Sequence, residues 1–361
     1  MKKILVVDDS ALMRRVLCDI INSDERFHVE DRATNGLEAF DLLSRKTYDA
    51  VVLDVNMPKM GGIELLRELQ KFKISARVMM ASTATSEGAK VTLDALELGA
   101  VDFIHKPVSA GDCRGADFKE RLLKILAVVS DSAVDMPVQG AAKPFRQKPV
   151  AVPVAKSEVP EKVSTGVIGK KLVAIASSTG GPKALQSVIP RLPKDLQAPV
   201  LLVQHMPKGF TASLAERLDS LSEITVREAA EGDVLESGCV YLSMGGSHLT
   251  VAVNAAGRYV IHYTDEPPRE GVRPCANYMY ESLGNCRFEE IVCVVMTGMG
   301  ADGTQGISNL KNNKKIHVIA QEQSTCVVYG MPKSIVTAGL ADQIVPLEQI
   351  AQAITAKVGG K

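Results

Sequence analysis

The sequence lacks the cysteine patterns that indicate a disulfide framework or a zinc site. Its 361 residues include seven cysteines, an odd number, and no two of them form a Cys-x-x-Cys pair. Disulfide frameworks and zinc sites are built from paired or clustered cysteines. We therefore expect free thiols and a reducing compartment.

An excess of either charge is also absent. The 42 basic and 42 acidic residues give a formal net charge of zero. A balanced chain has no broad positive field that would attract nucleic acid or an anionic membrane. We expect no nucleic-acid partner, and recognition of other partners through local contacts.

Long apolar runs are missing as well. No stretch approaches the roughly 18 apolar residues of a membrane-spanning helix. The first residues, MKKILVVDDS, do not read as a signal peptide, because their apolar run has only four residues and ends in two aspartates. We expect a cytoplasmic protein without membrane insertion.

Short apolar runs alternate with amphipathic stretches over residues 1–128. Rich in β-branched residues, these runs are typical of buried parallel strands: Ile4–Val7, Ala50–Leu53, Val78–Ala81 and Val101–Ile104. The pattern predicts a doubly wound, flavodoxin-like α/β domain. The length of the chain leaves room for a second domain.

Residues 129–167 differ in composition from the preceding domain and predict a flexible linker. The segment has scattered lysines, no periodicity and prolines at 137, 144, 149, 153 and 160. An ordered arm that bridges the domains is the alternative.

Residues 168–358 predict a second, larger doubly wound α/β domain. The strand-like runs are Leu172–Ala176, Val200–Val203, Ile291–Met296 and His317–Ala320. Shorter alternating segments with glycines between residues 224 and 262 predict a short antiparallel excursion.

Carboxylates follow two strands of the first domain. Asp8 and Asp9 come directly after the first run, and Asp54 comes directly after Val51–Leu53. An aspartate after a strand is by itself most often a helix cap. Ligand sites of parallel sheets, however, lie at the carboxyl ends of strands, and three carboxylates there would repel one another unless they shared a cation such as Mg²⁺.

A hydroxyl and an ammonium belong to the same predicted edge. Ser82 ends the run MMAS, and Lys106 follows a later strand in DFIHKP. With VVDDS and VVLDVNMPKMGG, they make residues 2–125 resemble bacterial response-regulator receiver domains. The resemblance implies that Asp54 accepts a phosphoryl group from a histidine kinase, and that Ser82 and Lys106 sense that group.

The resemblance also implies a metal site and a backbone feature. Asp8, Asp9 and Asp54 would bind Mg²⁺ together with the backbone carbonyl of Asn56. The Lys106–Pro107 peptide bond is expected to be cis.

The second domain opens with a strand that runs into a tight Ser-Thr-Gly-Gly turn, in KLVAIASSTGGPKAL. Pro182 stands where a helix would begin. A serine on such a turn is exposed and lies near backbone N–H groups that stabilise an oxyanion. The string is not Gly-x-Ser-x-Gly, so a phosphate-binding or purely structural turn is the alternative.

A histidine and an aspartate follow two other strands. His205 lies in QHMPKGF, and Asp302 lies in the glycine-rich TGMGADG. Each alone is more often structural. Together with the serine they place a nucleophile, a base and an orienting carboxylate at one edge of a sheet.

Residues 171–355 look like the catalytic domain of chemotaxis protein-glutamate methylesterases, through STGG, QHMPxGF, TGMGxDG and CVVYGMP. The resemblance implies Ser178 as nucleophile, in preference to Ser177, with His205 as base and Asp302 as its orienting group.

The oxyanion hole has two candidate donors. The resemblance implies the N–H of Met299, and the position of Thr179 beside the nucleophile makes its N–H a candidate by geometry.

The implied activity is removal of methyl esters from chemoreceptor glutamates, with methanol released, and deamidation of receptor glutamines by the same route. The receptors are the implied substrate partners, and the ester chemistry needs no metal. The receiver is expected to cover the cleft until it is phosphorylated.

One segment departs from the family pattern. Residues 273–277 read RPCAN where RPSVD is usual, which leads us to expect an altered cleft edge and substrate preference. A phosphorylation-dependent scaffold without turnover is one alternative. A receiver joined to a DNA-binding output is another, which the zero net charge and the lack of a helix-turn-helix pattern disfavour.

Overall fold

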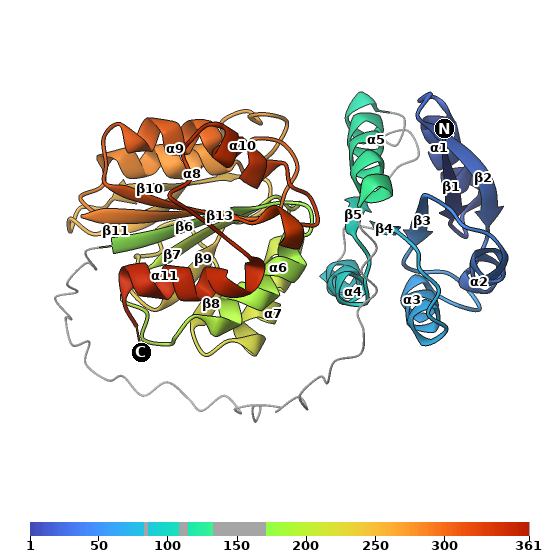
Figure 1. The fold of residues 1–361 in the computed structure, drawn as a ribbon, viewed down its shortest axis with the longest axis horizontal. Coiled ribbons are helices and arrows are strands. Elements are labelled where there is room, and N and C mark those ends of the chain that lie inside the picture. Colours follow the sequence, from blue (N-terminus) through green and yellow to red (C-terminus); the bar gives the residue numbers. More distant parts are fainter. Residues whose placement is uncertain (83–85, 108–114, 133–170, 361) are drawn as a thin grey trace.

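The structure is a computed structural model that describes residues 1–82, 86–107, 115–132 and 171–360, in two α/β lobes (Figure 1). Most of the predicted linker, from residue 133 on, and Cys113 lie outside the described residues. The last helix of the first lobe, α5, continues to Asp131, three residues past position 128.

The first lobe is a five-stranded parallel sheet in the order β2-β1-β3-β4-β5. Its strands are β1 Lys2–Val7, β2 Phe27–Ala33, β3 Ala50–Asp54, β4 Val78–Ser82 and β5 Asp102–His105. Its helices are α1 Ala11–Asn22, α2 Gly36–Arg45, α3 Gly62–Lys71, α4 Ser86–Glu97 and α5 Ala116–Asp131. Helices α1 and α5 cover one face of the sheet, and α2, α3 and α4 cover the other (Figure 1).

Strand β2 was missing from the predicted apolar runs. It lies at the sheet edge, where buried and exposed side chains alternate along Phe27–Ala33. The central strand β3 is buried along its whole length and reads as a continuous apolar run. Continuous apolar runs therefore predict buried strands such as β3, and they leave out alternating edge strands such as β2.

The second lobe is a seven-stranded parallel sheet in the order β14-β13-β12-β6-β7-β9-β8, with a separate hairpin β10-β11. Its strands are β6 Lys171–Ser177, β7 Val200–Gln204, β8 Thr225–Glu228, β9 Cys239–Leu242, β10 His248–Val253, β11 Tyr259–Thr264, β12 Glu290–Val295, β13 Ile316–Gln321 and β14 Gln343–Val345. Its α-helices are α6 Gly181–Val188, α7 Phe210–Leu221, α8 Ala276–Ser282, α9 Thr304–Lys311, α10 Met331–Thr337 and α11 Ile350–Val358. Helices α6, α7 and α11 lie on one face, and α8, α9, α10 and the hairpin lie on the other (Figure 1).

The predicted antiparallel excursion is confirmed only in part. Strands β10 and β11 pair antiparallel, as expected. Strands β8 and β9 instead join the main sheet in parallel register beside β7. The alternating pattern of β8 reflects its position at the sheet edge rather than a hairpin, whereas β9 is buried along its whole length.

Both sheets place their polar loops where the strand order reverses. In the first lobe this point lies between β1 and β3, and in the second between β12 and β6. Crevices at such points are the usual ligand sites of open parallel sheets. Asp8, Asp9 and Asp54 follow or end the first pair of strands, and Ser178 and Asp302 follow the second pair.

The two lobes pack against each other through α4 and β5 of the first lobe and α6 and α7 of the second. Phe103 of β5 stacks on Phe210 of α7, with ring centroids 4.9 Å apart. Glu97 of α4 pairs with Arg217 of α7. One apolar cluster continues from the first lobe into the second.

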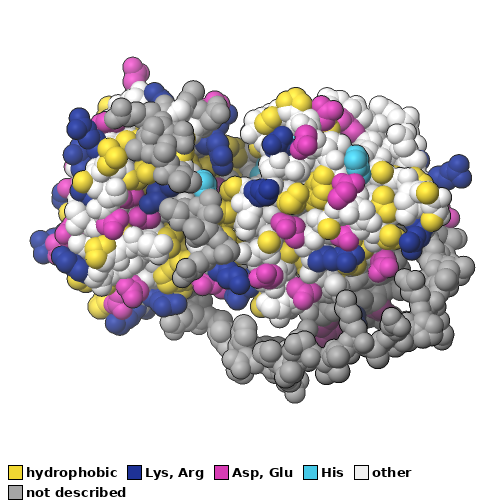
Figure 2. Space-filling model, turned by 180° about the vertical axis from the view of Figure 1, so that it is seen from behind, with side chains coloured by type: hydrophobic (Ala, Val, Ile, Leu, Met, Phe, Trp, Pro, Cys, Tyr) yellow, Lys and Arg dark blue, Asp and Glu magenta, His cyan; other side chains and the backbone are white. Residues whose placement is uncertain are grey.

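The composition of the chain led to expectations for its cysteines, its helices and its surface charge. The six described cysteines are free thiols. None of the described helices has both the length and the apolar character needed to cross a membrane. On the face shown in Figure 2, basic and acidic side chains are interspersed rather than gathered by sign.

Candidate functional site

Three carboxylates converge at the carboxyl ends of strands in the first lobe. One oxygen each of Asp8, Asp9 and Asp54 lies within 4.8 Å of the others. Asp8 and Asp54 are buried, and Asp9 is exposed. The Lys106 Nζ lies 2.6 Å from Asp54 Oδ1 and 3.2 Å from Asp8 Oδ2.

The charge balance of this cluster favours a cation. Burial raises the pKa of both Asp8 and Asp54, the positive charge of Lys106 opposes that rise, and repulsion from a neighbouring carboxylate adds to it. One ammonium therefore does not fully compensate the acidic groups. A set of carboxylate oxygens at this spacing fits Mg²⁺, which prefers oxygen ligands.

The other predicted receiver residues lie around this cluster. Ser82 ends β4 and is buried, and its hydroxyl donates to the carbonyl of Gly88 over 3.4 Å. Asn56 is exposed in the loop after β3. The prediction of a cis Lys106–Pro107 bond is wrong, because the cis bond found in the described residues is Arg273–Pro274.

Two adjacent serines end strand β6, and the structure gives them different surroundings. The Ser177 side chain is fully buried, and its hydroxyl donates to Gln204 Oε1 over 2.7 Å. Ser178 is partly exposed on the turn that leads into α6. Gly180, at φ 75°, makes that turn possible. Of the two serines, only Ser178 is accessible to solvent.

The loop after β12 approaches Ser178 closely. The Ser178 N–H donates to the Thr297 carbonyl over 3.0 Å. A Cβ atom at Gly298 would lie 2.7 Å from the Ser178 Cβ, so only glycine fits there. Neither the Met299 N–H nor the Thr179 N–H donates to another residue within the described ranges. Both N–H groups are available to a substrate oxygen.

A histidine and a buried carboxylate meet beside this turn. His205 follows β7, and its Nε2 lies 2.7 Å from Asp302 Oδ2. Burial alone would raise the pKa of Asp302, but the hydrogen bonds and charge of His205, with further donors, hold it at about 2. The carboxylate therefore stays ionised, and His205 donates from Nε2 and keeps Nδ1 as its acceptor nitrogen.

No hydrogen bond joins the Ser178 hydroxyl to His205 among the described contacts. Their backbones are neighbours nonetheless, since the Gln204 side chain donates to the Ser178 carbonyl and the His205 N–H donates to the Ser177 carbonyl. Such catalytic hydrogen bonds are often long without substrate and shorten when it binds.

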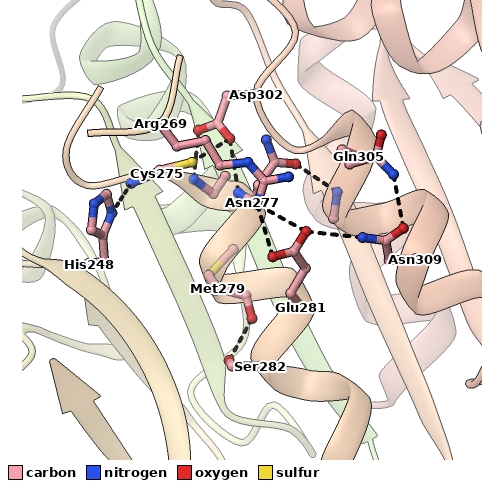
Figure 3. Close-up of polar contacts among 12 residues, drawn as sticks. His248, Arg269, Cys275, Asn277, Met279, Glu281, Ser282, Asp302, Gln305 and Asn309 are labelled. Carbon is pink, nitrogen blue, oxygen red and sulfur yellow. Dashed lines mark hydrogen bonds and ion pairs between the residues drawn. The ribbon is translucent and has the colours of Figure 1, made fainter. Parts of the chain in front are cut away.

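The segment 273–277 packs against Asp302, with Arg273 exposed at its start. Pro274, Cys275, Ala276 and Asn277 are buried, and the last three all donate to the Asp302 carboxylate (Figure 3). Sequence reasoning missed this role, because donors from a distant segment leave no local pattern. The departure from the family motif was the sole signal that singled the segment out.

Fold and site together define a class of protein: a response regulator whose receiver is joined to an α/β domain that carries a serine, a histidine and an aspartate at one sheet edge. Residues 4–116 match the response regulator receiver domain, and residues 173–354 match the CheB methylesterase. The chain belongs to the CheB methylesterase family, and it is therefore an enzyme.

The similarity to relatives of known name extends over nearly the whole chain. The protein-glutamate methylesterase/protein-glutamine glutaminase 1 of Syntrophomonas wolfei is 43% identical over 356 residues, 98% of each chain. The enzyme of the same name, without the numeral, from Bacillus subtilis is 41% identical over 360 residues, 99% of each chain. The CheB methylesterase catalytic domain of Thermotoga maritima is 41% identical, with a TM-score of 0.50, and the match covers 52% of this chain and 98% of that one.

Proposed function

We propose that this chain is a phosphorylation-controlled hydrolase that removes methyl esters from chemoreceptor glutamates and deamidates receptor glutamines in chemotaxis adaptation. The observation that carries the proposal is the His205–Asp302 pair, 2.7 Å apart, on the loops that flank the partly exposed Ser178 at the reversal point of the sheet. The names of the relatives supply the substrate class.

The geometry supports a two-step acyl transfer. Ser178 Oγ attacks the ester carbonyl while His205 Nδ1 takes the hydroxyl proton, and Asp302 stabilises the imidazolium through Nε2–H. The N–H groups of Met299 and Thr179 stabilise the oxyanion. Methanol leaves with the proton from His205, and water then releases the glutamate. A glutamine follows the same route with ammonia as the leaving group.

The receiver is the phosphoacceptor. Asp54 takes the phosphoryl group from a histidine kinase, and Asp8, Asp9 and Asp54 hold Mg²⁺ with the Asn56 carbonyl. Mg²⁺ held by these residues would supply positive charge beside the transferring phosphoryl group. Ser82 and Lys106 then bind the phosphoryl oxygens, which draws Lys106 from its contacts with Asp8 and Asp54.

The docked receiver touches the turn that carries the nucleophile. The Thr179 hydroxyl, next to Ser178, donates to Asp102 Oδ2 of β5 over 2.6 Å. The two lobes enclose a cavity of about 340 Å³, lined by Asp102, Gly180, Thr297 and Cys326 among others. A long receptor helix would need this face free. Phosphorylation therefore activates by shifting the population toward an undocked state.

Methanol release from methylated receptor membranes tests this function. We expect a basal rate that a small phosphodonor raises, and an Asp54→Ala variant that keeps the basal rate but ignores the donor. Removal of Mg²⁺ with EDTA should likewise abolish the response to the donor and leave basal release unchanged. Release of no methanol from any receptor, with phosphorylation intact, would favour the scaffold alternative.

The buried carboxyl of Asp102 leads to a second prediction, which concerns how docking depends on pH. Burial raises the pKa of this carboxyl from the ordinary 3.8 to about 6, despite hydrogen bonds from Thr179 and the Phe103 N–H, and undocking would remove part of that burial. The docked state thus binds the proton more tightly. Docking is weakest above about pH 6, where Asp102 is charged in both states, and strengthens as the pH falls toward about 4.

Replacing Asp102 with asparagine removes this charge and keeps a polar partner for Thr179. We expect tighter docking and a basal methanol release about threefold to tenfold lower at pH 7.5, recovered at saturating phosphodonor. Asp41→Asn, a change of the same kind on the exposed side of α2, is the matched control. A basal rate that rises in Asp102→Asn would contradict the proposed inhibitory contact.

A further inference from the structure

The Asp302 carboxylate is surrounded by four donors, two on each oxygen. Oδ2 receives the His205 Nε2–H over 2.7 Å and the Ala276 N–H over 2.6 Å. Oδ1 receives the Asn277 N–H over 2.9 Å and the Cys275 thiol, with Sγ 3.0 Å away (Figure 3). An ionised carboxylate has about four acceptor sites, so this one is saturated.

The Cys275 thiol is the only side-chain donor to Asp302 besides His205 in the described part of the chain. The residue is fully buried at the N-cap of α8, yet it does not cap its own helix and turns toward Asp302 instead. Its backbone is held from the other side, because the Cys275 N–H donates to Nδ1 of the buried His248 over 3.1 Å. The direction of the thiol is therefore set by contacts from β10 and from the loop after β12.

The thiol keeps the proton that it donates. Burial, reinforced by the negative charge of Asp302, raises the pKa of Cys275 far above its ordinary value. A buried cysteine is often merely a small apolar residue. Here the Sγ atom lies 3.0 Å from an oxygen of an ionised, buried carboxylate, so the thiol is a hydrogen-bond donor to a charged group and has a polar role.

We propose that Cys275 is a positioning residue of the hydrolase, whose thiol hydrogen bond to Asp302 sets how strongly that carboxylate stabilises protonated His205. The proposal rests on the assignment of Ser178, His205 and Asp302 proposed above. Removing the thiol leaves Oδ1 with one donor and makes the carboxylate a stronger partner for the imidazolium. His205 would then stay protonated, and unable to take the Ser178 proton, up to a higher pH.

The other ionisable groups around the thiol are fixed by their own contacts. Burial lowers the pKa of His248, which keeps it neutral. Arg269 is paired with Glu281 over 2.9 Å, and Glu270 accepts from the Asn277 side chain over 3.2 Å. A change at Cys275 therefore acts on the site through Asp302.

The test measures the base without needing the receptor. A fluorophosphonate forms a phosphonate ester with an activated serine, with loss of fluoride and with the hydroxyl proton passing to the base. Its rate of reaction with the full-length protein is followed by intact mass from about pH 5 to pH 9, a range that spans the ionisation of the base. The variants are Cys275→Ala, Cys275→Val and Cys275→Ser, and thermal unfolding confirms that each is folded.

We expect the acid limb of the pH profile to move up by about half a unit in Cys275→Ala and Cys275→Val, an approximately threefold slower reaction on that limb. Cys275→Ser, which keeps a donor, should return the limb to the wild-type position. Cys286→Ala removes another buried thiol, whose weak contact is to the Ser282 carbonyl, and should leave the limb unmoved.

Two results would overturn the proposal: an unmoved limb in both donor-free variants, or an equal upward shift in Cys275→Ser. Ser178→Ala separates this failure from that of the triad assignment. If the wild type is unlabelled, or if Ser178→Ala is still labelled at the wild-type rate, the assignment and the proposal fall together. If labelling requires Ser178 but methanol release is absent, the substrate class alone is wrong.

Discussion

Replacing Ser178 with alanine is expected to lower methanol release by roughly 10⁵-fold or more, to a level near that of unassisted hydrolysis. On the turn after β6, Ser178 is the partly exposed hydroxyl, while the neighbouring Thr179 is buried. The loss should appear in the rate at saturating receptor, since the ester still binds. Phosphorylation of Asp54 should be unaffected, because the change lies in the other lobe.

The neighbouring serine supplies the matched control. Ser177→Ala removes a buried hydroxyl that donates to Gln204 Oε1, so a polar partner is left unsatisfied. We expect a loss of stability of about 1–3 kcal/mol, with most of the activity retained in the folded protein. If Ser177→Ala is inactive while Ser178→Ala turns over, the nucleophile has been assigned to the wrong serine.

The candidate site could be placed from the sequence because parallel strands end at the same edge of a sheet. Ser178, His205 and Asp302 lie far apart in the chain, but each follows an apolar run, and the order β12-β6-β7 brings those runs side by side. The same reasoning placed Asp8, Asp9 and Asp54 together at the β1 and β3 ends. Strand ends are thus enough to predict that His205 meets Asp302 and that the three aspartates converge.

The contacts that tune these residues could not be predicted in this way. The donors to Asp302 from residues 275–277 come from the start of α8, and Asp102 reaches Thr179 only because two lobes dock. Neither contact leaves a periodic pattern, since each depends on how elements distant in sequence pack. The edge strands β2 and β8 were misread for the related reason that partly exposed strands carry weaker patterns, whereas β9 is buried and was misread because its parallel pairing with β7 and β8 joins segments distant in sequence.

The substitution Asp302→Asn is the most stringent test of the four donors around this carboxylate. The carboxylate oxygens face four donors, so an amide of the same shape must direct its NH₂ group at two of them. Placed on the Oδ2 side, the amide would oppose the Ala276 N–H and favour the tautomer in which His205 carries its proton on Nδ1. That tautomer cannot take the Ser178 proton. Placed on the Oδ1 side, it would oppose the Asn277 N–H and the thiol.

We therefore expect Asp302→Asn to lower the rate at saturating receptor by about 10³- to 10⁴-fold. The wild-type pKa of about 2 lies below the ordinary 3.8, so ionised Asp302 stabilises the fold above about pH 4 and loses that contribution as the pH falls toward 2. Asp302→Asn should lack this pH dependence in urea unfolding. Asp219→Asn, which alters a carboxylate that accepts the Val226 N–H away from the site, should keep full activity. An active Asp302→Asn enzyme would mean that His205 finds its tautomer without this carboxylate, and that the donors around it serve the fold alone.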